Sequence, residues 1–269
     1  MRKALLVGFR YSGNQKLPGI LIDLYLVYNF LKKNEWDDSE ICILTDIKHD
    51  HQTNVLRSAI LDKTVKTDIL SFIKDIKKRE QYIHYQSDKY YNNFIKNLPQ
   101  SVNLFYYYTG HCKNNNYVLP NDALVDFPYF LSHLKKYKQV ILLLDACELS
   151  INLAYRFIDG VYRFENEVFY SNHILCLSSS SEKEKSIAHI KGSFFSKYII
   201  NILENRNLKI SDIMNETEKE NMTSIKINSE INSKINIKAS YPILYLFSWL
   251  YSKTDLYILK NTYNLKLIY

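Results

Sequence analysis

Two residues of this sequence have side chains suited to nucleophilic catalysis, and they stand at equivalent points of two apolar segments. Cys147 follows the run "VILLLD" (140–145), and His111 follows "NLFYYYTG" (103–110). A nearby imidazole makes a thiol a better nucleophile, because the imidazolium cation favours the thiolate. The 36 residues from His111 to Cys147 match the length of one helix and one strand. If the two apolar segments are neighbouring strands, the pair predicts a cysteine–histidine catalytic site.

Ordinary structural roles stay open for the same two residues. A cysteine is often a small core residue that takes no part in chemistry. A histidine that follows glycine, as His111 follows Gly110, is often a turn residue. The types of the two residues alone do not decide between these roles and catalysis.

The segments that must position this pair alternate between strand and helix patterns. Short apolar runs predict strands at 3–9, 40–46, 103–111, 139–145, 173–181 and 241–249. Apolar residues at helical spacing predict helices at 20–33, 67–78, 127–136, 192–206 and 211–223. Such alternation is typical of an α/β fold, with a mostly parallel central sheet of about six strands between two layers of helices (αβα). Active sites in such sheets lie beyond the carboxyl ends of the strands. Three predicted strands end in Asp46, His111 and the Asp145/Cys147 pair.

Composition favours one domain. The chain has 269 residues, of which 46% are hydrophobic, enough for a substantial core. Only 6 Gly and 5 Pro leave little material for flexible linkers. We therefore predict a single domain at 1–252, with 79–98 as an inserted segment and 253–269 as a C-terminal tail.

Charge and hydropathy bear on the partners of the protein. The net charge of +7 comes from 35 basic and 28 acidic residues that are scattered along the chain, which is typical of a solvated surface and not of a nucleic-acid site. No segment approaches about 20 uninterrupted apolar residues, so we expect no membrane span. The widely spaced cysteines (Cys42, Cys112, Cys147 and Cys176) contain no Cys-x-x-Cys pair and indicate free thiols in a cytoplasmic protein.

Several segments resemble metacaspases, which are cysteine peptidases of the caspase type. "YYYTGHC" (106–112) is similar to the "YSGHG" segment of that family, and "LLLDACELS" (142–150) is similar to its "DSCHSG" segment. Further similar segments lie at 2–23, 41–46, 114–122, 173–187, 192–199 and 241–248. The matches follow the family's order over most of residues 2–248, so the resemblance implies a caspase-like fold and a single peptidase domain.

The resemblance also implies roles for the candidate residues. Cys147 would attack the scissile carbonyl and form an acyl-enzyme, and His111 would act as general base and acid. Backbone N–H groups of Cys112 and Cys147 would hold the oxyanion. The implied activity is that of a cysteine endopeptidase without a cofactor, acting on proteins and peptides.

The positions that match the family's S1 pocket are Asp23, Thr109 and Asp145. Two carboxylates in one pocket repel each other unless a cation arrives, so the match implies Arg or Lys at P1 of the substrate. Structural roles stay open here too, because Asp23 lies in the first turn of a predicted helix and Asp145 can cap a strand.

Departures from the family pattern support a second hypothesis. Cys112 replaces the glycine after the histidine and would be strained if the site needs a glycine-type backbone. Glu148 places an anion beside the thiol, which raises the pKa of a thiol and opposes its activation. The alternative is therefore a catalytically weak or inactive caspase-fold protein that acts as a binding partner or regulator.

Calcium dependence and self-cleavage are two further features of the family. The acidic loop of the family is missing, and Asp122 and Asp126 are too few for a calcium site, so we expect no metal and no calcium dependence. Arg156 and Arg163 are candidate self-cleavage sites, although the short segment that holds them favours an uncut single chain. The resemblance implies a monomer, because metacaspases generally do not form the strand-to-strand dimer of caspases.

Overall fold

The computed structural model describes residues 2–46, 72, 82–84, 91, 96–97, 103–147, 155–158, 161–164, 173–179, 192–204 and 243–247. The predicted helix at 211–223, the tail at 253–269 and Glu148 lie outside these residues, as do most of the predicted helix at 67–78 and of the segment at 79–98. No prediction about them is tested below.

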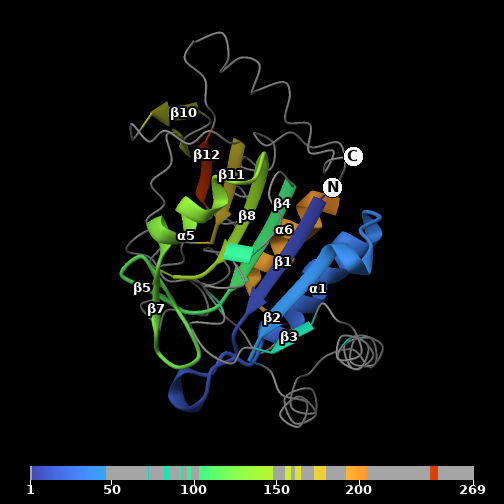
Figure 1. Cartoon of the computed structure of the whole chain (residues 1–269), viewed down its shortest axis with the longest axis vertical. Helices are drawn as coiled ribbons and strands as arrows, with labels where there is room; N and C mark the ends of the chain where they lie inside the picture. Colours follow the sequence, from blue (N-terminus) through green and yellow to red (C-terminus); the bar gives the residue numbers. More distant parts are fainter. Residues whose placement is uncertain are drawn as a thin grey trace, which may run out of the picture.

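A nine-stranded sheet forms the centre of the described structure, in the order β10-β9-β12-β11-β8-β4-β1-β2-β3 (Figure 1). Its strands are β1 (Arg2–Gly8), β2 (Ile41–Thr45), β3 (Tyr82–His84), β4 (Asn103–Thr109), β8 (Gln139–Asp145), β9 (Tyr155–Ile158), β10 (Val161–Phe164), β11 (His173–Ser178) and β12 (Ile243–Phe247). The six strands from β11 to β3 in this order are parallel, whereas β12, β9 and β10 pair antiparallel at one edge.

Helices cover both faces of this sheet. Helices α1 (Ile20–Lys33) and α6 (Phe194–Glu204) lie on one face, and α5 (Phe127–Leu134) lies on the other. Side chains alternate across the strands, as the two-residue period of a strand requires. Leu142 and Leu144 of β8 pack in the core under α5, whereas Leu143 packs in the core under α1 and α6. The predicted three-layer α/β architecture with a mostly parallel sheet is therefore confirmed.

Predicted elements agree closely with the observed ones where the sequence pattern is long. Helix α1 has the predicted bounds, and all six predicted strands are present. The described part of the sheet also contains three short strands beyond the six predicted ones, namely β3, β9 and β10. A second sheet follows β4 and consists of β5 (Cys112–Lys113), β6 (Asn116–Val118) and β7 (Leu124–Asp126).

The additional strands are only two to four residues long, too short to show a hydrophobic period. The hairpin formed by two of them, β9 and β10, nevertheless has a signal in the sequence. Asp159-Gly160, a dipeptide typical of tight hairpins, separates β9 from β10. The candidate cleavage residues Arg156 and Arg163 are paired across these two strands.

Close packing between α1 and β1 brings the start of α1 to the carboxyl end of the strand. A Cβ atom on Gly8 would lie 2.8 Å from the Ile20 side chain and 2.9 Å from the Leu24 side chain, so a larger residue here would force these side chains or the helix to shift. Asp23 lies in the first turn of α1, between these two contacts. The glycine that ends β1 thus sets the position of Asp23 relative to the sheet.

Two short 3₁₀ helices complete the described structure, at Gly13–Gln15 and Asp38–Glu40. Within the ranges given above, every helix is too short or too polar to cross a membrane.

The packing of the core predicts a large loss of stability when a buried side chain of β8 is shortened. Leu143 is fully buried, so Leu143→Ala is expected to lower the free energy of unfolding by about 2–5 kcal/mol, through lost burial and the cavity left behind. Urea denaturation measures this change. The matched control is Leu124→Ala on β7, where the side chain is 55% exposed and the expected change is within about 0.5 kcal/mol. Equal losses in the two variants would contradict the described packing.

Candidate active site

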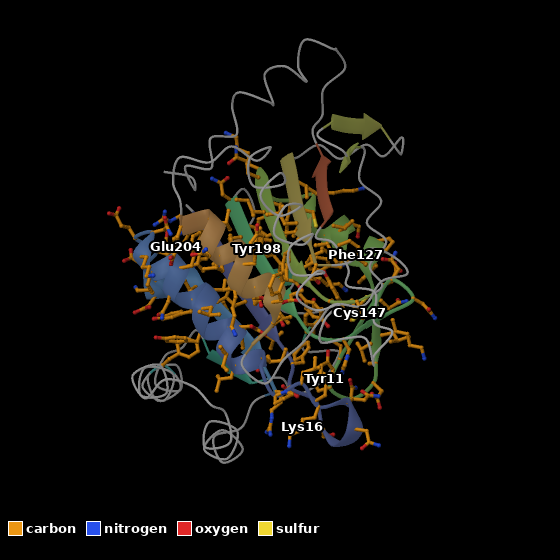
Figure 2. The ribbon with its side chains drawn as sticks, turned by 180° about the vertical axis from the view of Figure 1, so that it is seen from behind. Tyr11, Lys16, Phe127, Cys147, Tyr198 and Glu204 are labelled. Atoms are coloured by element: carbon orange, nitrogen blue, oxygen red, sulfur yellow. The ribbon has the colours of Figure 1, made fainter. Side chains whose placement is uncertain are left out.

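The register between β4 and β8 places the candidate catalytic residues. The two strands are parallel, and Thr109 pairs with Asp145 at their carboxyl ends. His111 and Cys147 each follow by two residues, so both lie just beyond the ends of neighbouring strands. The backbone N–H of Gly110 donates to the carbonyl of Asp145 at 3.3 Å and ties the two connections together. Cys147, Tyr11 and Lys16 lie toward the same end of the sheet, the end where β1 finishes (Figure 2).

The imidazole of His111 has a defined orientation. Its Nε2 lies 2.6 Å from the carbonyl oxygen of Gln15. A carbonyl only accepts hydrogen bonds, so Nε2 carries the proton of the neutral ring and Nδ1 is the basic nitrogen. The ring of Tyr11 lies against the imidazole, with 4.5 Å between ring centroids. These contacts select the tautomer that a general base at Nδ1 requires.

The backbone of His111 is held by two tyrosine hydroxyls. Its N–H donates to Tyr11 Oη at 2.8 Å, and Tyr108 Oη donates to its carbonyl at 2.8 Å. Val118 N–H donates to the same carbonyl at 3.0 Å. The position of His111 thus depends on β4, on β6 and on the loop after β1.

The two candidate pocket carboxylates are buried and share one serine. Asp23 is 2% exposed and Asp145 is 5% exposed. Ser193 donates its backbone N–H to Asp23 Oδ1 at 2.7 Å and its hydroxyl to Asp145 Oδ2. Ser196 also donates its hydroxyl to Asp145 Oδ2, at 2.6 Å. The start of α6 therefore joins a carboxylate of α1 to a carboxylate of β8.

Burial and repulsion act on the charge of this pair. Burial raises the pKa of Asp23 well above its usual value, and the nearby charge of Asp145 raises it further. The N–H of Ser193 and the charge of Lys197 oppose that rise in pKa. Asp145, in contrast, accepts from hydroxyls at the start of α6, where the helix dipole favours a negative charge. The arrangement therefore opposes ionisation of both carboxylates at the same time.

Gly192 makes the contact between α6 and Asp23 possible. Its φ is +93°, and a Cβ atom there would lie 2.7 Å from Asp23 Oδ1. Only glycine adopts this backbone readily and leaves room for the carboxylate. The adjacent Ser193 N–H can therefore reach Asp23.

Thr109 and Tyr107 of β4 border the carboxylate pair. Thr109 is buried opposite Asp145 in the sheet. The hydroxyl of Tyr107 lies 2.5 Å from Ser196 Oγ, and since that serine donates to Asp145, Tyr107 is the donor in this contact. Burial raises the pKa of Tyr107, and the charges of Asp23 and Asp145 raise it further, so the phenol stays protonated.

The three predicted pocket residues thus lie together in one buried cluster with Ser193 and Ser196. His111 and Cys147 follow β4 and β8, the two strands that contribute Thr109 and Asp145 to this cluster. Cys112 lies on β5, where it pairs with Tyr117 and its side chain is buried. Its backbone lies outside the left-handed region, so the strain considered for a non-glycine residue at this position is not present. No group of three His, Cys, Asp or Glu side chains in the described ranges could hold a metal ion.

Sequence reasoning missed Gln15, Gly192, Ser193 and Ser196. Gln15 acts through its backbone carbonyl, which no residue type reveals. The other three lie in "GSFFSKYI" (192–199), a segment that resembles the family but for which no site role was predicted. A glycine followed by a serine at the start of a helix is a capping signal, and Ser193 Oγ does accept from Ser196 N–H at 2.9 Å.

Comparisons with known proteins give a likeness of fold. No protein-family model matches the sequence, and no curated protein does so either. A solved protein from Geobacter sulfurreducens has a TM-score of 0.51 and 11% identity, over 96% of each chain. Caspase-1 from Spodoptera frugiperda has a TM-score of 0.47 and 10% identity, over 91% of this chain and 87% of that one. At this score the second likeness carries no argument, and at these identities neither speaks to the reaction.

The raised pKa of Asp23 predicts a pH-dependent effect of Asp23→Asn on stability. A carboxyl group whose pKa is raised by folding stabilises the folded protein fully at a pH below the pKa of the unfolded chain, 3.8. That contribution is lost as the pH rises through the pKa of the folded protein. Asparagine does not ionise, so the unfolding free energy of the variant relative to the wild type is expected to rise from pH 4 to pH 8. Thermal or urea unfolding across this range measures it.

The control for this series is Asp126→Asn, because Asp126 is an exposed carboxylate that accepts from Tyr129 N–H at the start of α5. A difference between Asp23→Asn and wild type that falls with pH would contradict a raised pKa of Asp23.

Proposed function

We propose that this protein is a metacaspase-like cysteine endopeptidase that cleaves after Arg or Lys, with Cys147 as nucleophile and His111 as base. The observation that carries the proposal is the register of β4 and β8, in which Thr109 pairs with Asp145 and each catalytic candidate follows two residues later. Neighbouring parallel strands thus direct an imidazole and a thiol to one edge of the sheet, where α/β enzymes have their active sites.

The proposed reaction proceeds through an acyl-enzyme. Nδ1 of His111 takes the thiol proton of Cys147, and the thiolate attacks the scissile carbonyl carbon. The oxyanion accepts from the backbone N–H groups of Cys112 and Cys147. When the tetrahedral intermediate collapses, the C–N bond breaks and His111 delivers the proton to the leaving amine. Water then attacks the thioester with His111 as base, which releases the acid and restores the thiol.

The carboxylate pair supports the proposed specificity. Asp23 and Asp145 are buried and interact as like charges, so ionising both is costly without a cation. A guanidinium or ammonium group at P1 would offset that repulsion and form charge-assisted hydrogen bonds. An acidic or apolar P1 side chain would leave the repulsion in place.

Glu148 favours a second candidate function. Its position next to Cys147 in the sequence places an anion beside the thiol, which opposes thiolate formation. A protein with a thiol that is hardly ionised would cleave poorly and would use the same acidic pocket to bind basic segments of a partner. Activity measurements separate the two functions.

Peptide cleavage tests the proposed reaction. The reduced protein is expected to cleave fluorogenic peptides with Arg or Lys at P1, and not with Asp, to a similar extent with calcium or with a chelator. Cys147→Ala is expected to abolish cleavage because the nucleophile is lost. The matched control is Cys42→Ala, which removes a cysteine on β2 that has no role in the proposed reaction and is expected to retain activity. Folded protein that cleaves none of these peptides would favour the binding role.

The acidic pocket predicts a selective loss in Asp145→Asn. Removal of one carboxylate is expected to lower kcat/KM for Arg and Lys peptides by more than about tenfold, because a charged pair at a buried site contributes more than about 1.4 kcal/mol. Steady-state kinetics with matched Arg and norleucine peptides measure the change. Asp126→Asn is the control for a change of charge alone. An equal loss for both peptides would contradict a role of Asp145 in recognising the cation.

A further inference from the structure

We infer that Asp46 is a positioning residue for His111: its carboxylate holds the loop of residues 10–17, which sets the tautomer and the place of the imidazole. The inference rests on the proposed function, in which His111 is the base. Asp46 directly follows β2, which is one of the three strands predicted to end in a reactive or charged residue. Asp46 has no part in the proposed reaction or in the carboxylate cluster described above.

The carboxylate of Asp46 grips two consecutive backbone amides. Arg10 N–H donates to Oδ1 at 2.6 Å, and Tyr11 N–H donates to Oδ2 at 2.9 Å. The charge of Asp46 also lies close enough to Arg10 to raise the pKa of that guanidinium, against the larger lowering by burial. One side chain just after β2 therefore fixes the point where the chain leaves β1.

The backbone that Asp46 binds has an unfavourable conformation at Tyr11, which the hydrogen bonds stabilise. Tyr11 has a φ of +60°, in the left-handed region that residues other than glycine avoid. Leu17 N–H donates to Arg10 carbonyl at 2.8 Å and closes the loop from the other side. The bonds to Asp46 hold Tyr11 in this conformation, since its own N–H is one of the two donors.

The same loop supplies two contacts to His111. Tyr11 Oη donates to Val118 carbonyl at 2.7 Å and accepts from His111 N–H at 2.8 Å, which locks the backbone of the histidine. The Gln15 carbonyl, four residues further along the loop, accepts from Nε2 at 2.6 Å. In Figure 2, Tyr11 and Lys16 mark the two parts of this loop below the sheet. Asp46 thus binds the loop by hydrogen bonds, and the loop in turn binds the backbone N–H and the ring of His111.

The carboxylate pair belongs to other elements. Asp23, Asp145 and Ser193 come from α1, β8 and the start of α6. Loss of the Asp46 contacts is therefore expected to release the imidazole and leave the P1 pocket in place. Substrate would bind as before, and the proton transfer would be slower.

Asp46→Asn tests the inference on the full chain. Asparagine keeps one carbonyl acceptor and replaces the other by an NH₂ donor, which faces a backbone N–H and cannot accept from it. The expected result is a kcat for Arg peptides lower by about tenfold to a hundredfold, with KM unchanged, since small displacements of a catalytic group have effects of this size. Asp126→Asn, which alters an exposed carboxylate at a helix start, is expected to leave kcat and KM unchanged.

The second readout is the tautomer of His111, measured from the ¹⁵N shifts of its ring by NMR. Wild-type protein is expected to show the Nε2–H form, and Asp46→Asn is expected to show a mixture of tautomers. Tyr11→Phe removes the acceptor of His111 N–H, keeps the backbone amide that binds Asp46, and is expected to lower kcat in the same way. It tests the path separately if Asp46→Asn does not fold.

The outcomes separate the inference from the proposed function. A lower kcat together with a mixed tautomer supports the positioning role. An unchanged tautomer in folded Asp46→Asn overturns it, and so does a loss that appears only in KM. If wild-type protein cleaves no peptide, the proposed function fails, and the tautomer alone decides whether Asp46 orients His111.

Discussion

The pairing of Thr109 with Asp145 at the ends of β4 and β8 is the constraint on which the rest of the site depends. Because the strands are parallel and in register there, the chain leaves the sheet at two adjacent points, with an imidazole on one connection and a thiol on the other. The register itself follows from burial. Side chains of β8 alternate between a core under α5 and a core under α1 and α6, so a slip of one residue would exchange the two faces of the strand.

The same edge of the sheet also lowers the stability of the folded protein. Two carboxylates lie buried beside each other, and Ser193 compensates part of the repulsion by donating to both. Gly192 and Gly8 allow this arrangement, since each lets a helix or its first residues approach where a Cβ atom would collide. Such buried charge is expected where a protein is selected to bind a cation and not for stability alone. The proposed specificity and the cost of burying these two carboxylates are thus two consequences of one geometry.

Much of the fold could be predicted because its central strands are buried on both faces and α1, the longest helix among the described residues, has clear ends. The strands β1, β4 and β8 are nearly uninterrupted apolar runs, and α1 ends in Lys32 and Lys33. The hairpin β9–β10 and the small sheet β5–β6–β7 are built from strands too short to show a pattern. The candidate pocket residues Asp23, Thr109 and Asp145 come from motifs that resemble the family, and the structure brings them into one buried cluster. Their partner Ser193 lies 48 residues from Asp145 and meets it only in three dimensions, and Gln15 acts through a carbonyl that every residue has.

The most direct test of the central claim is the site and rate of alkylation by a peptide chloromethyl ketone with Arg at P1, followed by mass spectrometry of the four cysteines. A thiolate at Cys147, activated by His111 and facing an acidic pocket, predicts stoichiometric labelling of Cys147 that is much faster than with a norleucine reagent. Slow labelling at similar rates by both reagents would contradict the account, and so would preferential labelling of Cys42, Cys112 or Cys176.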